Sequence, residues 1–494
     1  MARVRTSARL QIARAVTRRL ALPALLALSL AACSTANIQT GASNPSPLPQ
    51  QQSELSPAQQ REHLRIVAAY GGIYEAQRLQ AMLDRTVQRL VAASERPDLR
   101  YQVTMLNSPA VNAFALPDGQ LYVTRGLIAL ANDNSELASV LAHEMAHVIA
   151  RHAMIRENQA RQAALVSRVA TDLLSDPQLG ALALAKSKIA LTSFSRAQEF
   201  EADGIGVGIS ARAGFDPYGA ERFLTSMGLN AQLRVQRSHI DPRAPDFLSS
   251  HPATPERITN AVVNARQFSG PEGGTREKSE YFSLLNGVVY GEDPSEGFVR
   301  GRRFLHPKLG FTFTAPEGFT LDNTAQAVFG VKDGGAQALR LDVVRVPAEQ
   351  TLAEYLVSGW IENIEQKSIE QFNVSGFPAA TATASGDTWT FRLYAVRFGS
   401  EVYRIIFAAK NRTDAVDRTF RESIDTFRRM SLAEMQSARP LRVRIVTVRR
   451  GDTVERLGRR MGGGDRAIER FRVLNGLGPH DKVKPGDVVK IVVE

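Results

Sequence analysis

The sequence is almost without cysteine, since Cys33 is the only one among 494 residues. A single cysteine excludes an intrachain disulfide framework, so the fold depends on buried apolar cores. Tryptophan is also scarce, with two residues, while 36 glycines and 23 prolines are too few for a disordered chain. An apolar content of 44% and a charged content of 22% are ordinary for globular proteins, and the length allows two to four domains.

Positive charge is in excess, but only locally. The formal net charge is +11, from 61 Lys and Arg against 50 Asp and Glu. Residues 1–33 contain six arginines and no acidic residue, and without them the net charge is +5. Residues 439–494 contain 14 basic and 7 acidic residues, so the part between carries about −2. The basic character therefore belongs to the two ends and not to the whole molecule.

The apolar segment near the N-terminus is short. Residues 20–32 form an apolar run of about a dozen residues, too few to cross ~30 Å of hydrocarbon as a helix. Arginines precede this run and Leu30-Ala31-Ala32-Cys33 ends it, a pattern typical of an export signal and similar to a bacterial lipobox. It predicts a lipoprotein signal peptide over 1–33 with a lipid on Cys33. The alternative is an ordinary signal peptide in which the cysteine occurs by chance.

Export also predicts a location and excludes one class of partner. In lipoproteins of this kind a serine after the lipidated cysteine indicates the outer membrane, and Ser34 stands there. We therefore expect the chain in the cell envelope, lipid-anchored at the periplasmic face of the outer membrane. No nucleic acid is expected as a partner there, so the basic C-terminus favours anionic cell-wall polymers or phospholipid headgroups. A merely solvated basic surface is the alternative.

The pattern of apolar residues changes several times along the chain. A polar, proline-rich tether is followed by helical periodicity, which a hairpin pattern around the turn Pro117-Asp118-Gly119 interrupts. Strand patterns dominate later. The sequence therefore predicts a multidomain fold with a mainly α-helical domain containing a small β-sheet, an α+β domain and a small βααβ module. The predicted segments are a signal peptide (1–33), a tether (34–53), the helical domain (54–268), a linker (269–296), the α+β accessory domain (297–435) and the βααβ module (440–494).

The strongest chemical signal is His143-Glu144-Met145-Ala146-His147. Residues four apart lie on one face of a helix, so both imidazoles point the same way and supply half of a tetrahedral zinc shell. Glu144 lies between them, within reach of a water on the metal. The motif alone also occurs by chance, but Asp133 and Glu136 predict the start of an amphipathic helix that would bury it.

A second candidate helix supplies carboxylates. Glu199 and Asp203 lie one helical turn apart within residues 195–203. A carboxylate from a second helix completes a shell of two histidines and one glutamate, which leaves a fourth position open for water. A carboxylate one turn later can accept the remaining ring N–H of a ligand histidine.

Here the sequence resembles the BepA/HtpX-like zinc metallopeptidase family, which consists of gluzincins related to the CAAX prenyl endopeptidases. The resemblance covers about residues 55–268 and is specific, because several separate motifs follow in the right order. The absence of transmembrane helices favours the periplasmic lipoprotein branch. The motifs are His143-Glu144-x-x-His147, Glu199-x-x-x-Asp203, the stretch 111–126 and the stretch 251–258.

The resemblance implies a role for each matching residue. His143, His147 and Glu199 would bind one Zn²⁺ per chain, Glu144 would be the general base that deprotonates a metal-activated water, and Asp203 would orient a ligand. His251 matches a loop histidine that caps the metal in some relatives, and an ordinary loop histidine is the alternative. Arg257 is a possible oxyanion helper, although an arginine at a helix start is easily structural.

The hairpin predicts how a substrate is held. Asn112, Ala113 and Phe114 are expected on an edge strand beside the cleft, where an extended peptide can add through main-chain hydrogen bonds. Such binding favours unfolded segments. Two neighbouring residues have simpler interpretations: His152 is expected to pack or hydrogen-bond without binding metal, and Glu201 is expected to face solvent.

The C-terminal region resembles a LysM module, on the Gly-Asp-Thr turn at 451–453 and the Pro-Gly-Asp turn at 485–487. The resemblance implies binding to glycans such as peptidoglycan, although the glycine run 462–464 and the many arginines depart from the pattern. The preceding α+β domain has no cluster of ligands or nucleophiles and is expected to be accessory.

Two functions follow from these patterns. The first is a zinc metalloendopeptidase that cleaves misfolded or unfolded cell-envelope proteins in quality control, a role that the family resemblance suggests. The second is a peptidoglycan-anchored chaperone or assembly factor in which His251 caps a mostly inactive zinc site.

Overall fold

The computed structural model describes most of the chain. The predicted signal peptide, Cys33 and the tether lie outside the described residues, so they stay predictions. Among the residues described, no helix is both long enough and apolar enough to cross a membrane. The described residues are 55–159, 161, 194–235, 250–270, 273–332, 334–359, 361–463 and 466–494.

The first two helices precede a small sheet. Helix α1 (Pro57–Ala69) begins at Ser56, which forms a reciprocal capping box with Gln59. Helix α2 (Gln77–Ala93) is amphipathic, and its apolar side, including Leu83 and Leu90, is buried in the core.

The predicted hairpin is confirmed. Strands β2 (Ala113–Ala115) and β3 (Gln120–Thr124) are antiparallel, and β1 (Gln102–Leu106) pairs with β3 in parallel, giving the order β1-β3-β2. Gly119 turns between the strands with φ +91°, and a Cβ there would lie 2.1 Å from the carbonyl oxygen of Arg100. Only glycine fits this turn. Strand β2 is left at the edge of the sheet.

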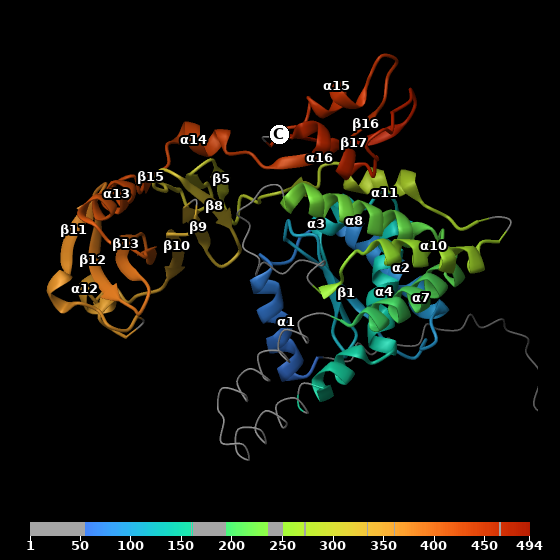
Figure 1. Ribbon diagram of the computed structural model, residues 1–494, viewed down its shortest axis with the longest axis horizontal. Helices are drawn as coiled ribbons and strands as arrows, with labels where there is room; N and C mark the ends of the chain where they lie inside the picture. Colours follow the sequence, from blue (N-terminus) through green and yellow to red (C-terminus); the bar gives the residue numbers. More distant parts are fainter. Residues whose placement is uncertain are drawn as a thin grey trace, which may run out of the picture. The chain divides into compact units, whose positions relative to one another are not determined.

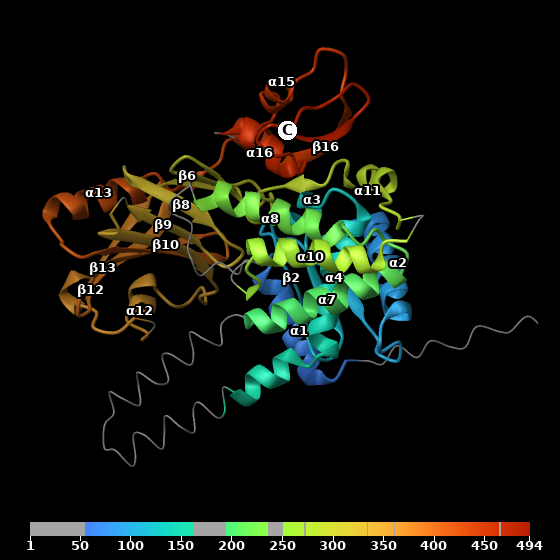
Figure 2. The same ribbon diagram turned by 45° about the vertical axis from the view of Figure 1, so that its right-hand side comes forward.

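Several helices follow the sheet in the described residues up to 268 (Figure 1). Short helix α3 (Arg125–Leu130) leads into α4 (Asn134–Ile149), which is capped by the Asp133 side chain and buried along nearly its whole length. Helix α7 (Arg196–Arg212) packs against α4, and α10 (Pro255–Phe268) packs against α7, as Figure 2 also shows. Helix α8 (Gly219–Val235) also contacts α4.

The segment predicted as a linker is structured, which corrects the sequence analysis. Within 269–296 the chain forms α11 (Lys278–Leu285) and β4 (Val289–Tyr290). Tyr281, Phe282 and Leu285 are buried in the same apolar core as α2 and α4. Eight residues are too few for helical periodicity to stand out in the sequence, so the pattern was missed.

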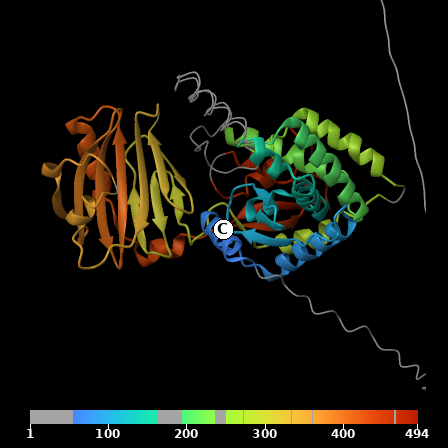
Figure 3. The ribbon, with the colours of Figure 1, turned by 90° about the horizontal axis from the view of Figure 1, so that it is seen from below.

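A larger β region follows. Its seven-stranded antiparallel sheet has the order β11-β12-β13-β14-β10-β9-β8, and Figure 3 shows these strands side by side. One face of the sheet packs over an aromatic core with α13 (Asp414–Asp425), and the other over a second core with α12 (Leu352–Leu356). The strands of this sheet are β8 (Phe319–Asn323), β9 (Val328–Lys332), β10 (Gln337–Val344), β11 (Glu370–Val374), β12 (Phe377–Ser385), β13 (Thr390–Phe398) and β14 (Glu401–Ala409).

A four-stranded sheet of order β15-β7-β6-β5 adjoins it. Phe304 and Phe311 from this small sheet contribute to the aromatic core of the larger one. The region therefore combines two sheets with short helices, as expected of an α+β domain. The remaining elements are β5 (Phe298–Arg300), β6 (Arg303–His306), β7 (Phe311–Thr314), the 3₁₀ turn Gln366–Ser368, β15 (Arg428–Arg429) and α14 (Leu432–Ser437).

The last region has the element order strand, helix, helix, strand. Strands β16 (Leu441–Thr447) and β17 (Val488–Val493) pair antiparallel. Helices α15 (Val454–Gly458) and α16 (Ala467–Leu474) lie between them in the sequence. Strand β16 also pairs with β4, and Val443 and Val473 are buried in the apolar core of the first region. The last region has an apolar core of its own, and Val443 and Val473 connect it to the core of the helices that carry the candidate site.

Candidate metal centre

Helix α4 presents the histidine motif on a rigid support. Its N-terminus is capped by Asp133, and every residue from Asn134 to His147 is buried. Because His143 and His147 are four apart, their rings meet on one side of the helix, with 3.0 Å between the two Nε2 atoms.

Helix α7 brings a carboxylate to the same place. Its start is set by the capping box of Ser195 and Gln198, and Gly206 allows it to approach α4 closely, since a Cβ there would lie 3.0 Å from the His143 Cα. Glu199 Oε2 lies 3.6 Å from His143 Nε2, and Glu199 Oε1 lies 3.6 Å from His147 Nε2. Two separate helices therefore converge on one point.

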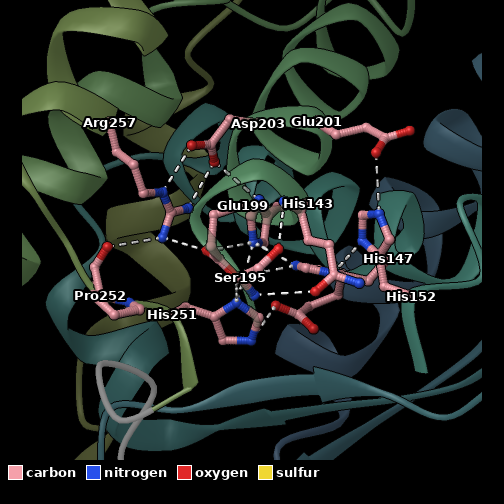
Figure 4. Close-up of polar contacts among 12 residues, drawn as sticks. His143, His147, His152, Ser195, Glu199, Glu201, Asp203, His251, Pro252 and Arg257 are labelled. Atoms are coloured by element: carbon pink, nitrogen blue, oxygen red, sulfur yellow. Dashed lines mark hydrogen bonds and ion pairs between the residues drawn. The ribbon is translucent and has the colours of Figure 1, made fainter. Parts of the chain in front are cut away.

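His251 arrives from a third segment, just before α10. Its Nδ1 lies 3.3 Å from His143 Nε2 and 2.9 Å from Glu199 Oε1. His143, His147, Glu199 and His251 are all buried, and one nitrogen or oxygen atom from each lies within 4.8 Å of the others. Figure 4 shows these side chains pointing toward a common centre.

A charged pair lies behind His143. Asp203 Oδ1 is 3.0 Å from His143 Nδ1, the ring nitrogen that faces away from the cluster. Arg257 donates to both oxygens of Asp203 at 2.7 Å, and its Nη1 lies 2.5 Å from Glu199 Oε2 and donates to the Pro252 carbonyl. The structure thus joins Asp203 to His143, and it directs Arg257 toward the two carboxylates.

A second histidine lies behind His147, and the sequence analysis missed this contact. His152 Nδ1 is 2.9 Å from His147 Nδ1, and His152 Nε2 is 3.3 Å from Glu201 Oε2 (Figure 4). Phe194 stacks on a face of the His147 ring at 3.9 Å between centroids. His152 was expected to be buried or hydrogen-bonded, and Glu201 is exposed as expected, but spacing alone gave no sign that the two meet.

Burial dominates the electrostatics of the cluster. It lowers the pKa of His143, His147 and His251, so these imidazoles are neutral and can act as ligands. Burial also raises the pKa of Glu199, and burial together with the Glu199 charge raises the pKa of Glu144 well above its usual range. For Asp203, burial is outweighed by the contacts with Arg257 and His143, which lower the pKa to about 2.

A cavity of about 570 Å³ opens beside the cluster. Glu144, His147 and His251 line one side, and Phe114 and Ala115 of edge strand β2 line another. Glu144 Oε1 is buried, has no hydrogen-bond partner among the described residues and lies 3.7 Å from His251 Nε2. A carboxylate in this position can exchange a proton with a molecule in the cavity.

The donor set fits a divalent metal ion. Asp203 and His152 face the Nδ1 atoms of His143 and His147, which favours protons on Nδ1 and lone pairs on both Nε2 atoms. Two lone pairs 3.0 Å apart repel each other unless a cation lies between them. Neutral imidazoles and a buried carboxylate are the donors that zinc prefers.

The same part of the chain matches known peptidases. The sequence profile described as "Peptidase family M48" matches residues 77–264. The beta-barrel assembly-enhancing protease of Escherichia coli (strain K12) is 32% identical over 189 residues, covering 36% of this chain and 37% of that protein. The protein of the same name from Yersinia pestis is 34% identical over 215 residues, covering 42% and 43%.

A mitochondrial protein is similar as well. The metalloendopeptidase OMA1 of Schizosaccharomyces pombe (strain 972 / ATCC 24843) is 33% identical over 178 residues, covering 36% of this chain and 50% of that protein. The chain thus spans half or less of the length of these relatives. The matched residues include α4, α7 and the segment with His251, which carry the whole cluster. Residues 77–264 of this chain are therefore similar to peptidase family M48.

Proposed function

We propose that this chain is a zinc-dependent metalloendopeptidase. The observation that carries the proposal is the convergence of His143, His147 and Glu199 on one point, with Glu144 beside them at the wall of a cavity. Relatives named as proteases and metalloendopeptidases support the same activity. They favour it over the alternative of a mostly inactive chaperone or assembly factor.

In this proposal His143, His147 and Glu199 hold one zinc ion, in a gluzincin-type site. A bound zinc ion supplies Lewis-acid activation of water and of the scissile carbonyl. Glu144 accepts the proton of the attacking water and returns it to the leaving amine. Its raised pKa suits a group that must carry the proton between these two steps.

Asp203 and Arg257 act in this proposal by orientation. Asp203 holds the ring of His143 through Nδ1, and Arg257 holds Asp203 with two parallel hydrogen bonds while it neutralises Glu199. The earlier hypothesis of an oxyanion helper requires a donor that faces the substrate. The contacts of the Arg257 guanidinium favour the structural role instead.

We propose His251 as a regulatory ligand. Its Nδ1 lies within 3.3 Å of His143 Nε2 and 2.9 Å of Glu199 Oε1, so it occupies the side from which a substrate carbonyl would approach. Activity then requires this histidine to withdraw. His251→Ala should therefore raise the rate of hydrolysis if capping limits the enzyme, and an unchanged rate contradicts the regulatory role.

Edge strand β2 provides a place for the substrate. Ala113 and Phe114 lie on it, Asn112 directly precedes it, and Phe114 lines the cavity that contains Glu144. The free edge can pair with an extended peptide and direct it across the cluster. We infer that unfolded or misfolded segments of envelope proteins are the substrates, because folded proteins do not present free main chain.

The decisive test is hydrolysis of casein by the purified chain lacking residues 1–33. We expect zinc-dependent cleavage that a chelator abolishes and added zinc restores. Metal analysis should find one zinc per chain, and Glu199→Ala should lose it. A protein that stays inactive with zinc, both as wild type and as His251→Ala, contradicts the proposal.

We further propose an anchored location and a cell-wall contact. The lipobox-like Leu30-Ala31-Ala32-Cys33 supports a lipid on Cys33 at the periplasmic face of the outer membrane. The element order β16-α15-α16-β17 supports a LysM-like module that binds peptidoglycan, with the α+β region as an accessory domain. Retention on purified peptidoglycan tests the module, and equal retention after charge-reversal of exposed Arg449 and Arg450 argues against a basic binding face.

A further inference from the structure

The two histidines of α4 differ in what lies behind them. Behind His143 is a carboxylate, Asp203, at 3.0 Å. Behind His147 is another imidazole, His152, at 2.9 Å, with the Glu201 carboxylate beyond it at 3.3 Å. Each ring therefore leads to a carboxylate of α7. His143 contacts Asp203 directly, and His147 is connected to Glu201 through His152.

The directions of these hydrogen bonds follow from the proposed metal site. If His147 offers its Nε2 lone pair to a metal, its proton is on Nδ1. This proton can only be shared with His152 Nδ1 if the latter accepts it, so a neutral His152 carries its own proton on Nε2. That nitrogen faces Glu201 Oε2, a carboxylate that only accepts. One arrangement of protons thus satisfies every contact in the row.

The backbone is bent to bring His152 here. In a continuous helix, a residue five positions after His147 would point about 140° away from it. Helix α4 ends at Ile149, and Arg151 adopts a left-handed conformation with φ 56° before helical residues resume at 152. Such a conformation is uncommon for a residue other than glycine and often marks a functional constraint. The turn places the buried His152 ring against His147.

His152 is not itself placed to bind the metal. The four ligand atoms that converge belong to His143, His147, Glu199 and His251. The contact with His152 involves Nδ1 of His147, the nitrogen on the opposite side of the ring from the cluster. Phe194 stacks on the same ring, so stacking restrains its tilt while the hydrogen bond restrains its rotation.

We propose that His152, oriented by Glu201, is a positioning residue that presents His147 Nε2 to the metal. This inference rests on the proposed function, since it assumes that His147 is a ligand. His152 accepts a hydrogen bond from the Nδ1–H group of His147. This bond fixes the tautomer and the orientation of the His147 ring, and it makes Nε2 a better electron-pair donor to the metal. Removal of such an outer partner typically weakens metal binding about 10–100-fold.

The test compares two substitutions of His152 in the purified chain. His152→Leu removes the acceptor, whereas His152→Asn keeps an oxygen that can accept the His147 proton. We expect His152→Leu to weaken zinc binding about 10–100-fold in competition with a chromophoric chelator, and His152→Asn to recover most of that loss. The visible spectrum of the cobalt-substituted protein should shift in His152→Leu, because the ligand field of His147 changes.

Controls separate positioning from stability. His306→Leu removes another buried histidine in the β region and should leave zinc affinity unchanged. The melting temperature of the metal-free protein shows whether each variant is folded. At the exposed end of the row, Glu201→Leu should weaken zinc binding more than Glu201→Gln, which retains an acceptor for His152. This second pair of variants tests the inference if His152→Leu does not fold.

The outcomes are distinct. Wild-type zinc affinity and an unchanged cobalt spectrum in folded His152→Leu overturn the inference, as does His152→Asn that is as impaired as His152→Leu. In both cases the proposed peptidase can still stand, because the wild type binds zinc. A wild type that binds no zinc contradicts the proposed function itself.

Discussion

Two buried polar clusters of this molecule differ in how completely the chain satisfies them. One surrounds Lys490 on β17, whose Nζ is fully buried and donates to the carbonyl oxygens of Ala129, Leu130 and Ala131 at 2.9, 3.0 and 2.8 Å. The other is the candidate metal centre, where Glu144 Oε1 is buried without a hydrogen-bond partner in the described part of the chain.

This difference distinguishes a purely structural contact from a candidate functional site. The three donors of the ammonium meet three carbonyl acceptors at the C-terminal end of α3, where carbonyls have no partner within the helix. The ammonium therefore has no further donor for a ligand, and its three bonds connect β17 to the end of α3. In the candidate metal centre, two imidazole nitrogens face each other, and one oxygen of Glu144 has no hydrogen-bond partner among the described residues, so the cluster leaves interactions that a bound ion would complete.

Among the variants that test this comparison, the largest expected effect is on the rate of casein hydrolysis. Glu144→Gln keeps the size of the side chain but removes the proton acceptor, so we expect casein hydrolysis to fall about 10²–10⁴-fold. Zinc content, measured by metal analysis, should stay at the wild-type level because Glu144 is not a ligand in the proposal. Wild-type turnover in this variant would show that another group is the base.

Next in size is the loss of Lys490. Lys490→Met removes the ammonium donor of three buried carbonyls, of which Leu130 keeps another donor, the Asn132 side-chain amide at 3.3 Å. Two carbonyls lose their donor, and each unsatisfied group costs about 1–3 kcal/mol, so we expect the free energy of unfolding to fall by about 2–6 kcal/mol. Denaturant titration measures this free energy. Lys482→Met, at an exposed lysine of the same region, should change it by less than about 0.5 kcal/mol. Equal stability of the two variants would contradict a structural role for the buried contact.

Metal removal should distinguish the clusters directly. Zinc at about 100 times its dissociation constant stabilises a protein by about 2.7 kcal/mol, so a chelator should lower the melting temperature of the wild type. Glu199→Ala should abolish this response, whereas Lys490→Met should melt lower and still respond to zinc. A response that survives in Glu199→Ala would place the metal elsewhere.

The smallest effect concerns the packing of α7 on α4. A Cβ at Gly206 would lie 3.0 Å from the Cα of His143, so Gly206→Ala should separate the helices and cost about 1–3 kcal/mol. Gly204→Ala is its control on the same helix, since its nearest neighbour would be 3.8 Å away. That variant should be neutral or up to about 1 kcal/mol more stable, because alanine favours the helix. Thermal unfolding of both variants, with and without zinc, checks the prediction.

Local patterns of the sequence were sufficient for several elements. The cap at Asp133 and the spacing of His143 and His147 predicted a helix with both rings on one face, which the structure confirms. The turn at Gly119 predicted the hairpin of β2 and β3. These predictions succeed because capping, helical spacing and turn conformation depend on residues only a few positions apart.

Other features depend on residues that are distant in sequence. His251 joins His143 across 108 positions, and Lys490 meets Ala131 across 359. Even the contact of His152 with His147, five residues apart, requires the left-handed turn at Arg151, which no propensity predicts. The sequence by itself determined the types of donor and the helices that carry them. Only the tertiary structure decided which donors face each other, because packing selects one arrangement of helices among many with the same local patterns.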